Sequence, residues 1–275
     1  MTSAPANLFD VSGRTVVVTG GLGQLGRQFA TTLLERGARV AILDTRAETA
    51  VIRNVLGPWG DSPNMLCIAA DVTQRRSLEE ALSKVESVLG APSGLVNNAA
   101  LDSPPGASAD ENGPFEAYPE SSWDDVLNVN VKGVMLCCQV FGGAMARSGG
   151  GSIVNISSIY GMVSPDQRIY AYRAASGKPF FKPIAYSASK AALLNMTRYL
   201  STYWAQSGVR VNTLTLAGVW NGQDDEFLAE YLRRVPLGRM AKETDYNAAI
   251  VFMLSDASAY MTGSNLVLDG GWTAW

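Results

Sequence analysis

The sequence of 275 residues contains no histidine, and this absence excludes more chemistry than any other feature of the composition. A Ser-His-Asp triad, a Cys-His pair and a histidine-ligated metal site all require an imidazole. Proton transfer must therefore use Tyr, Lys, Asp, Glu, Ser or water, and we expect no bound metal.

Cysteine and excess charge are also scarce. The three cysteines are Cys67, Cys137 and Cys138. Two of them are adjacent and the third is distant in the sequence, a spacing that fits neither a disulfide framework nor a zinc site. A net charge of −3 gives no reason to expect nucleic acid or an anionic membrane as partner. No apolar run reaches transmembrane length, and the first residues lack the basic and apolar regions of a signal peptide. We therefore expect a cytoplasmic protein.

Short β-branched runs alternate with longer helical patterns along the whole chain. This order predicts an α/β fold of the Rossmann type, a doubly wound parallel sheet flanked by helices, in a single domain over residues 1–275. Two connections, 101–121 and 164–183, are too long for ordinary loops, and we expect 164–183 to be a substrate lid. The predicted strands are 14–19, 39–44, 65–70, 94–97, 152–157, 210–216 and 265–268. The predicted helices are 24–36, 47–56, 77–89, 123–147, 185–206, 226–233 and 244–254.

A glycine-rich turn follows the first predicted strand, with Gly20, Gly23 and Gly26 preceding or opening a helix. Such a turn lets the backbone approach a pyrophosphate, which the amides of a helix N-terminus favour. Asp44 ends the second strand, where a carboxylate can accept both ribose hydroxyls and repel a 2′-phosphate. NAD is thus expected over NADP, although Arg46 could pair with a phosphate. The alternative function for Asp44 is a helix N-cap.

Polar and small residues follow two further strands. Asp71 and Val72 come after the third strand, and Asn98 and Ala99 come after the fourth. The carboxyl ends of parallel strands form the ligand-binding edge of an open sheet, so these residues are candidate cofactor contacts. Taken singly, each could equally be a cap or a turn.

Four residues form a candidate catalytic group. Tyr186 and Lys190 lie at positions i and i+4 of a predicted helix and so share one face. A nearby ammonium favours a phenolate and is expected to lower the pKa of Tyr186. Ser158 would hold the substrate oxygen, and Asn130 would hold a water that passes protons to Lys190. The alternative is a half-buried aromatic residue and a solvated lysine.

Together these segments resemble the short-chain dehydrogenase/reductase family in its compact, single-domain form. The resemblance runs from TGGLGQLG through DVT, NNAA, NVNVKG, IVNISSIYG and YSASK to RVNTLTLAG and MTGSNLVLDGG. It implies a homotetramer or dimer formed through the two long helices and the C-terminal segment. It also implies that the main chain of residues 217–219 faces the nicotinamide. The implied catalytic tetrad is Asn130, Ser158, Tyr186 and Lys190. The implied cofactor contacts are Gly20, Gln24, Leu25, Gly26, Asp44, Asp71, Val72, Asn98, Ala99, Tyr186, Lys190, Gly218 and Val219.

The chain departs from the family pattern at several positions. Gln24 replaces the middle glycine, and the resulting glycine spacing is similar to that of the extended branch, which acts on nucleotide sugars. NNAA stands in place of Asn-Asn-Ala-Gly, and Ala217-Gly218 in place of Pro-Gly.

The sequence as a whole predicts reversible NAD(H)-dependent oxidation of a secondary alcohol to a ketone. A nucleotide-sugar dehydratase or epimerase with retained NAD and a non-catalytic dinucleotide-binding regulator are the alternatives.

The largest departure is an insertion between Ser158 and Tyr186, which lie 28 positions apart. A basic, aromatic lid could bind an anionic or sugar-like small molecule by pairing and ring stacking, or it could pack on the body or on a neighbouring subunit. The enlarged segment is similar to that of dehydrogenases in bacterial surface-sugar and flagellin-glycosylation pathways. Its basic and aromatic residues are Arg168, Arg173, Lys178, Lys182, Tyr170, Tyr172, Phe180 and Phe181.

Overall fold

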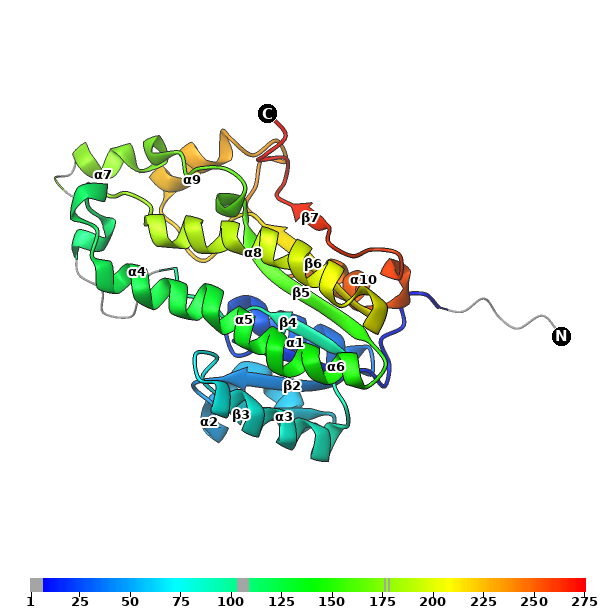
Figure 1. Ribbon diagram of the computed structural model, residues 1–275. Coiled ribbons are helices and arrows are strands. Elements are labelled where there is room, and N and C mark those ends of the chain that lie inside the picture. The colour runs from blue at the N-terminus through cyan, green and yellow to red at the C-terminus, as the bar shows by residue number, and fades with distance from the viewer. Residues whose placement is uncertain (1–6, 103–108, 176, 178) are drawn as a thin grey trace.

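The computed structural model describes residues 7–102, 109–175, 177 and 179–275, and a seven-stranded parallel sheet forms its centre (Figure 1). The strand order is β3-β2-β1-β4-β5-β6-β7, so the winding reverses between β1 and β4. At such a switch point a crevice opens beyond the carboxyl ends of the strands. The strands are β1 (Thr15–Thr19), β2 (Arg39–Asp44), β3 (Met65–Ala69), β4 (Gly94–Asn97), β5 (Gly151–Ser158), β6 (Val209–Leu216) and β7 (Asn265–Leu268).

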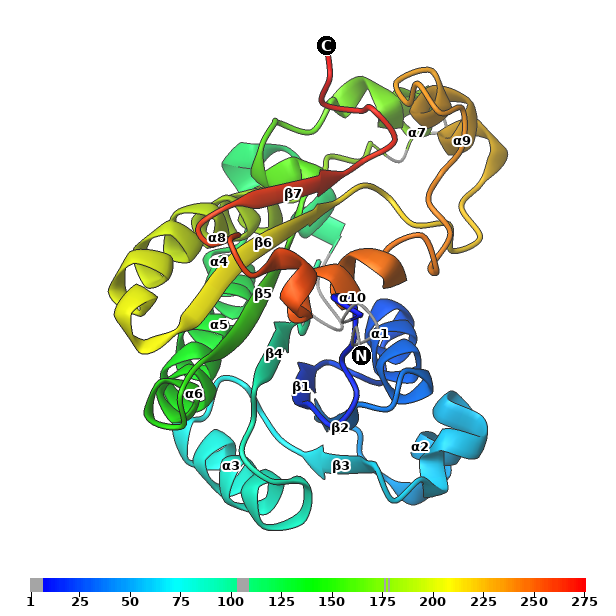
Figure 2. The ribbon, with the colours of Figure 1, turned by 90° about the vertical axis from the view of Figure 1, so that its right-hand side faces the viewer.

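Helices cover both faces of this sheet (Figure 2). One face packs against α1 (Gln24–Glu35), α2 (Thr49–Leu56) and α10 (Asn247–Leu254). The other packs against α3 (Arg75–Leu89), a long helix over Glu120–Arg147, and α8 (Ile184–Tyr203). Successive side chains of a strand point to opposite faces. Val16 and Val18 accordingly pack in the core on the α1 and α10 face, and Val17 packs in the core on the α3 and α8 face.

The helix Glu120–Arg147 consists of α4 (Glu120–Leu127), α5 (Val134–Cys137) and α6 (Gly143–Arg147), joined by π-helical turns. By length and composition it could cross a membrane, which corrects the expectation that no apolar segment is long enough. That expectation considered uninterrupted apolar runs, and polar residues such as Asn130 and Lys132 interrupt this one. Within its most apolar window, 61% is buried inside the protein, as in a core helix.

The predicted fold class is confirmed, and the strand boundaries agree to within one residue at either end. Helices differ more. The predicted helix 244–254 begins at Asn247 because turns occupy the preceding residues, and the predicted helix 185–206 ends at Tyr203 before a 3-10 turn. The insertion 164–183, for which no helix or strand was predicted, contains a 3-10 turn (Gln167–Tyr170) and α7 (Ala171–Ala175).

A third hydrophobic cluster lies apart from the two sheet faces. It combines the insertion, α9 (Asp225–Leu232) with the chain that follows it, and the C-terminal segment. α7 and α9 lie together at one end of the molecule in both views (Figures 1 and 2). The buried members of the cluster are Ile159, Ile169, Tyr170, Tyr231, Val235, Met240 and Trp272.

Candidate active site

The turn between β1 and α1 has room only for glycine at two positions. Gly20 has a φ of +61°, and a Cβ there would lie 2.8 Å from the Cα of Ala99. A Cβ on Gly26 would lie 2.2 Å from the carbonyl oxygen of Gly20. Among the described residues no side chain caps the N-terminus of α1, so its first N–H groups remain available for an anion. The turn therefore has the shape and the donors that a dinucleotide pyrophosphate requires.

Gln24, which replaces the expected glycine, makes a contact that the sequence did not predict. Its side-chain amide donates a hydrogen bond of 2.9 Å to the carbonyl of Trp220, in the loop after β6. Gln24 and Leu25 line both of the cavities described below. The Gln24 side chain thus connects the glycine turn to the loop on the other side of the cleft.

Asp44 lies at the carboxyl end of β2 with only 8% of its surface exposed. Its two oxygens accept hydrogen bonds from the N–H groups of Leu22 and Arg46, both 3.1 Å long. The guanidinium Nε of Arg46 is 3.8 Å from Oδ1, and that side chain is largely exposed. The alternative that Asp44 caps the next helix is wrong, because α2 begins at Thr49 with Glu48 at its N-cap position.

Asn98 and Asp71 are occupied largely by their own turns. The Asn98 amide donates to the carbonyls of Thr19 and Gly20 at 3.1 and 3.0 Å, which fixes the end of β1. Asp71 Oδ1 accepts hydrogen bonds from the N–H and the hydroxyl of Thr73. Both residues nevertheless line a cavity of about 650 Å³ together with Asp44 and the glycine turn.

A second cavity of about 410 Å³ adjoins the first and shares Gln24, Leu25, Asn98 and Ala100 with it. Ser158, the last residue of β5, lines this cavity with Tyr186 and Lys190 from the first two turns of α8. The Lys190 ammonium donates a hydrogen bond of 2.9 Å to the carbonyl of Ile156 and lies 5.7 Å from the centre of the Tyr186 ring. The structure thus brings together three of the four predicted catalytic residues.

The direction of the Tyr186 pKa shift corrects the sequence expectation. Burial raises the pKa of the phenol, the negative charge of Asp102 adds to the rise, and a hydrogen bond with Ser158 opposes it. Burial also lowers the pKa of Lys190 to about 8, against the opposing charge of Asp102. In both groups desolvation is the largest cause, and it disfavours the charged form.

Asn130 is buried in the π-helical stretch Asn128–Gly133, and its side chain binds protein groups. Its oxygen accepts the N–H of Leu101 at 2.7 Å, and its amide donates to the Leu101 carbonyl at 2.8 Å and to the Ser189 hydroxyl at 2.9 Å. Both amide hydrogens are therefore used, and a relay water could bind Asn130 only through its acceptor atoms.

A buried polar network fixes α8 to the sheet below the cavity. Asn97 donates to Asn155 at 2.8 Å, Asn155 donates to Thr197 at 2.9 Å, and Thr213 donates to the same threonine at 2.7 Å. Ser157 donates a bond of 2.8 Å to the main-chain carbonyl of Lys190. These bonds join β4, β5 and β6 to the helix that carries Tyr186 and Lys190.

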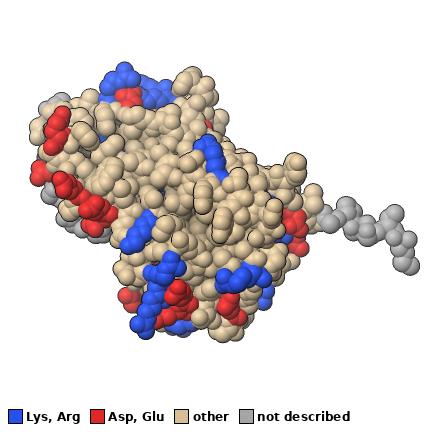
Figure 3. Space-filling model, in the orientation of Figure 1, with Lys and Arg blue, Asp and Glu red and all other residues tan. Residues whose placement is uncertain are grey.

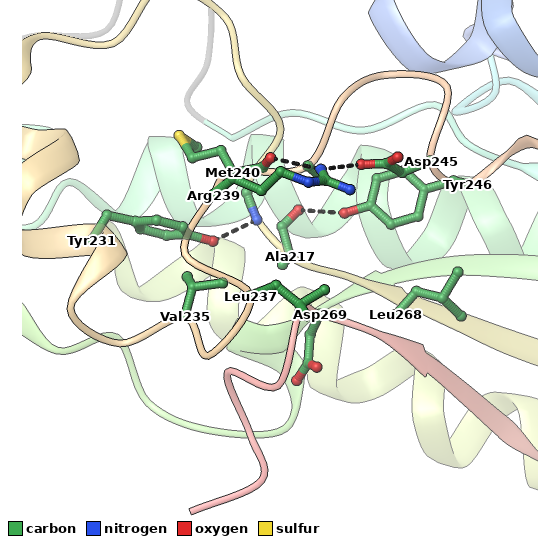
Figure 4. Close-up of a pocket in the computed structure, with 13 residues that line it drawn as sticks. Ala217, Tyr231, Val235, Leu237, Arg239, Met240, Asp245, Tyr246, Leu268 and Asp269 are labelled. Atoms are coloured by element: carbon green, nitrogen blue, oxygen red, sulfur yellow. Dashed lines mark hydrogen bonds and ion pairs between the residues drawn. The ribbon is translucent and has the colours of Figure 1, made fainter.

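Ala217 and Gly218 also line a third cavity, of about 260 Å³ (Figure 4). The N–H of Gly218 donates to the hydroxyl of Tyr231 at 2.8 Å, and Tyr246 donates to the carbonyl of Ala217 at 3.3 Å. The N–H of Gly218 is used by Tyr231, but Ala217 and Gly218 also line the 410 Å³ cavity, and the expectation that the main chain here faces the nicotinamide stays a prediction. Val219 lines the 410 Å³ cavity as predicted.

The insertion both packs on the body and lines the cleft. Asp166 pairs with Arg234 at 2.7 Å, and Tyr172 donates to Asp224 at 2.9 Å, which ties the insertion to α9 and its ends. Tyr170 and Lys182 line the 410 Å³ cavity. Of the four basic residues predicted to grip a substrate, Lys178 lies outside the described residues.

A glycine turn at the switch point of a parallel sheet, an acidic residue at the end of β2, and a Ser-Tyr-Lys cluster beside them define a nicotinamide-dependent oxidoreductase. Residues 21–273 match the family described as enoyl-(acyl carrier protein) reductase. D-Threitol dehydrogenase from Mycolicibacterium smegmatis is 32% identical over 96% of this chain and 95% of that protein.

Two solved structures are similar over almost their whole length. A short-chain dehydrogenase from Leptospira borgpetersenii with bound NAD+ is 30% identical, with a TM-score of 0.84 over 99% of this chain and 98% of that chain. A gluconate 5-dehydrogenase from Burkholderia cenocepacia in complex with NADP and tartrate is 25% identical, with a TM-score of 0.83 over 98% of each chain. This chain belongs to the short-chain dehydrogenase/reductase family, and it interconverts a secondary alcohol and a ketone with a nicotinamide cofactor.

Proposed function

We propose that this protein prefers NAD and oxidises a secondary alcohol of a small, sugar-like molecule, with Tyr186 as the acid/base. The observation that carries the proposal is the cluster of Ser158, Tyr186 and Lys190 on one cavity that adjoins the glycine turn. The relatives named above are dehydrogenases, and their similarity to this chain covers nearly its whole length. A dehydrogenase is therefore favoured over a dehydratase, an epimerase or a regulator.

In this mechanism the alcohol oxygen lies between the hydroxyls of Ser158 and Tyr186. When bound, NAD would supply the hydride acceptor at this site. Tyr186 would accept the hydroxyl proton of the alcohol and return it to solvent. Lys190 would hold the nicotinamide ribose and favour the phenolate, and Asn130 would support the proton path. Because burial raises the pKa of Tyr186, only a small fraction is ionised near neutral pH.

The NAD preference rests on Asp44. Its position and its hydrogen bonds to two backbone N–H groups hold a carboxylate at the end of β2, beside the cavity of about 650 Å³. There it would accept the ribose hydroxyls and repel a 2′-phosphate. Gly20, Gln24, Leu25 and Gly26 would hold the pyrophosphate. The remainder of the cofactor site would be lined by Asp71, Val72, Asn98, Ala99, Gly218 and Val219.

The test is Tyr186→Phe, with Tyr203→Phe on the exposed far end of the same helix as control. Turnover of threitol, glycerol and related alcohols should be lost in the first variant and unchanged in the second. NADH binding, measured by fluorescence titration, should stay within about twofold in both, since the phenol hydroxyl is only one contact. Full activity in Tyr186→Phe would refute the assignment.

We also expect a cytoplasmic homo-oligomer, a tetramer or a dimer. Trp123 and Met135 on the helix Glu120–Arg147 and Tyr199 and Tyr203 on α8 are exposed. Charged side chains are few over the middle of this face (Figure 3), and such apolar surfaces mark interfaces. Light scattering on the purified protein, beside a Tyr199→Asp variant, tests this expectation.

A further inference from the structure

An ion pair lies at the substrate side of the cleft. Lys182, four residues before Tyr186, places its ammonium 2.5 Å from the Asp102 carboxylate and 5.1 Å from the centre of the Tyr186 ring. Asp102 belongs to the segment that follows β4, and both residues line the same cavity as Ser158 and Tyr186. The Lys182 side chain is 14% exposed and that of Asp102 is 56% exposed, so the carboxylate retains an open side.

The described basic residues of the insertion are matched by carboxylates. Arg168 contacts Asp166 at 2.8 Å, Arg173 lies 3.5 Å from Asp224, and Lys182 contacts Asp102. Of the insertion, Tyr170 and Lys182 line the cavity, so the charge it brings there is one ammonium paired with the Asp102 carboxylate. The residues that share the cavity include the neutral side chains of Tyr160, Tyr170, Asn221 and Gln223.

We propose that the Asp102–Lys182 pair recognises a neutral polyhydroxylated substrate and disfavours one that carries a carboxylate; this rests on the proposed function and names its substrate class. A hydroxyl both donates and accepts, so vicinal hydroxyls can donate to Asp102 while they accept from Lys182. A carboxylate only accepts, is repelled by Asp102, and can bind Lys182 only by competing with a partner at 2.5 Å.

The experiment compares matched probes that differ only in charge at one end: threitol with threonate, and glucitol with gluconate. In the native enzyme, kcat/KM for each polyol should exceed that for its aldonate by about tenfold, the scale of one unfavourable charge contact at a carboxylate that is 56% exposed. In Asp102→Asn the ratio of the polyol value to the aldonate value should fall about tenfold, since the repulsion is gone and Lys182 is freed. Loss of the Asp102 charge also favours the Tyr186 phenolate, but it does so for both probes and leaves their ratio unaffected.

Lys182→Gln is the second variant. It should lower kcat/KM for the polyols without raising kcat/KM for the aldonates. The control is Asp61→Asn, which breaks an exposed 3.1 Å ion pair with Arg53 on the α2 side of the sheet. This variant should leave kcat/KM unchanged for both the polyols and the aldonates. An aldonate preference in the native enzyme, or equal losses for both probe series in Asp102→Asn, would overturn the proposal. NADH titration shows in each case that the variant is folded.

Binding is measured separately from turnover, by calorimetric titration of each probe into the enzyme–NADH complex, where an alcohol cannot react. Tighter binding of polyols than aldonates without any oxidation would support the substrate class and refute the proposed dehydrogenase activity. Oxidation accompanied by tighter binding of aldonates would do the reverse. The two proposals therefore fail by different results.

Discussion

Replacing Asp44 by Asn should shift the cofactor preference from NAD towards NADP. The asparagine has nearly the same shape, and its single amide oxygen can still accept one of the two N–H groups, of Leu22 and Arg46, that the carboxylate now binds. The substitution therefore removes a charge at the end of β2 with little other change. The folded state should lose about 1 kcal/mol for the missing acceptor.

The magnitude follows from the buried position of the carboxylate, which is 8% exposed. Two unit charges separated by about 5 Å repel by about 3 kcal/mol at an effective dielectric constant of about 20, which sets the scale for a 2′-phosphate beside this carboxylate. Screening at the cleft mouth reduces this value, so NADPH should bind about 10- to 100-fold more tightly in the variant. NADH should bind about tenfold more weakly, because hydrogen bonds from the ribose to a charged acceptor are lost.

Arg46 supplies the control. Its Nε lies 3.8 Å from Asp44 Oδ1, and it becomes free to pair with a phosphate when the carboxylate is removed. Arg46→Gln should thus have little effect on the native enzyme but should reverse part of the gain when combined with Asp44→Asn. Fluorescence titration with NADH and NADPH measures all four proteins without any substrate. Equal affinity of the native enzyme for NADH and NADPH would refute the reasoning, and so would an unchanged ratio of the two affinities in Asp44→Asn.

Three further predictions concern the cleft. Alcohol oxidation needs the Tyr186 phenolate, whose pKa is raised by burial, so kcat/KM should climb about tenfold per pH unit from pH 6 to 8, while a profile that is flat there contradicts this role. Gln24→Ala removes the 2.9 Å bond to the Trp220 carbonyl, and stopped-flow release of NADH should become about fivefold faster; an unchanged rate would separate this bond from cofactor retention. Tyr231→Phe leaves the Gly218 N–H without its 2.8 Å partner and should cost about 1–3 kcal/mol in urea unfolding, with no loss expected if water replaces the hydroxyl.

The sheet and the position of the site could be predicted from the sequence because their signals are local. β-Branched runs mark the strands, Gly20 and Gly26 mark a turn that a Cβ would obstruct, and Tyr186 and Lys190 are one helical turn apart. The structure brings Ser158, Tyr186 and Lys190 to one cavity at the ends of the predicted strand and helix, and their catalytic roles stay a prediction.

What could not be predicted depends on distance and burial. Gln24 and Trp220 are 196 residues apart, and Asp102 and Lys182 are 80 apart, so neither pair leaves a local pattern. The pKa of Tyr186 has the opposite direction from the prediction because the loss of solvent around the phenol is invisible in a spacing rule. The amide of Asn130 is likewise committed to Leu101, a partner that only the folded chain supplies.

The third hydrophobic cluster has a consequence for the divergence of substrate choice. Its apolar residues and the Asp166–Arg234 and Tyr172–Asp224 contacts join the insertion to α9 rather than to the two sheet cores. This part of the molecule can thus change while the half that recognises the shared cofactor stays constant. Grafting residues 164–183 alone into a relative would break these contacts, whereas moving them together with the α9 region would transfer an intact recognition module.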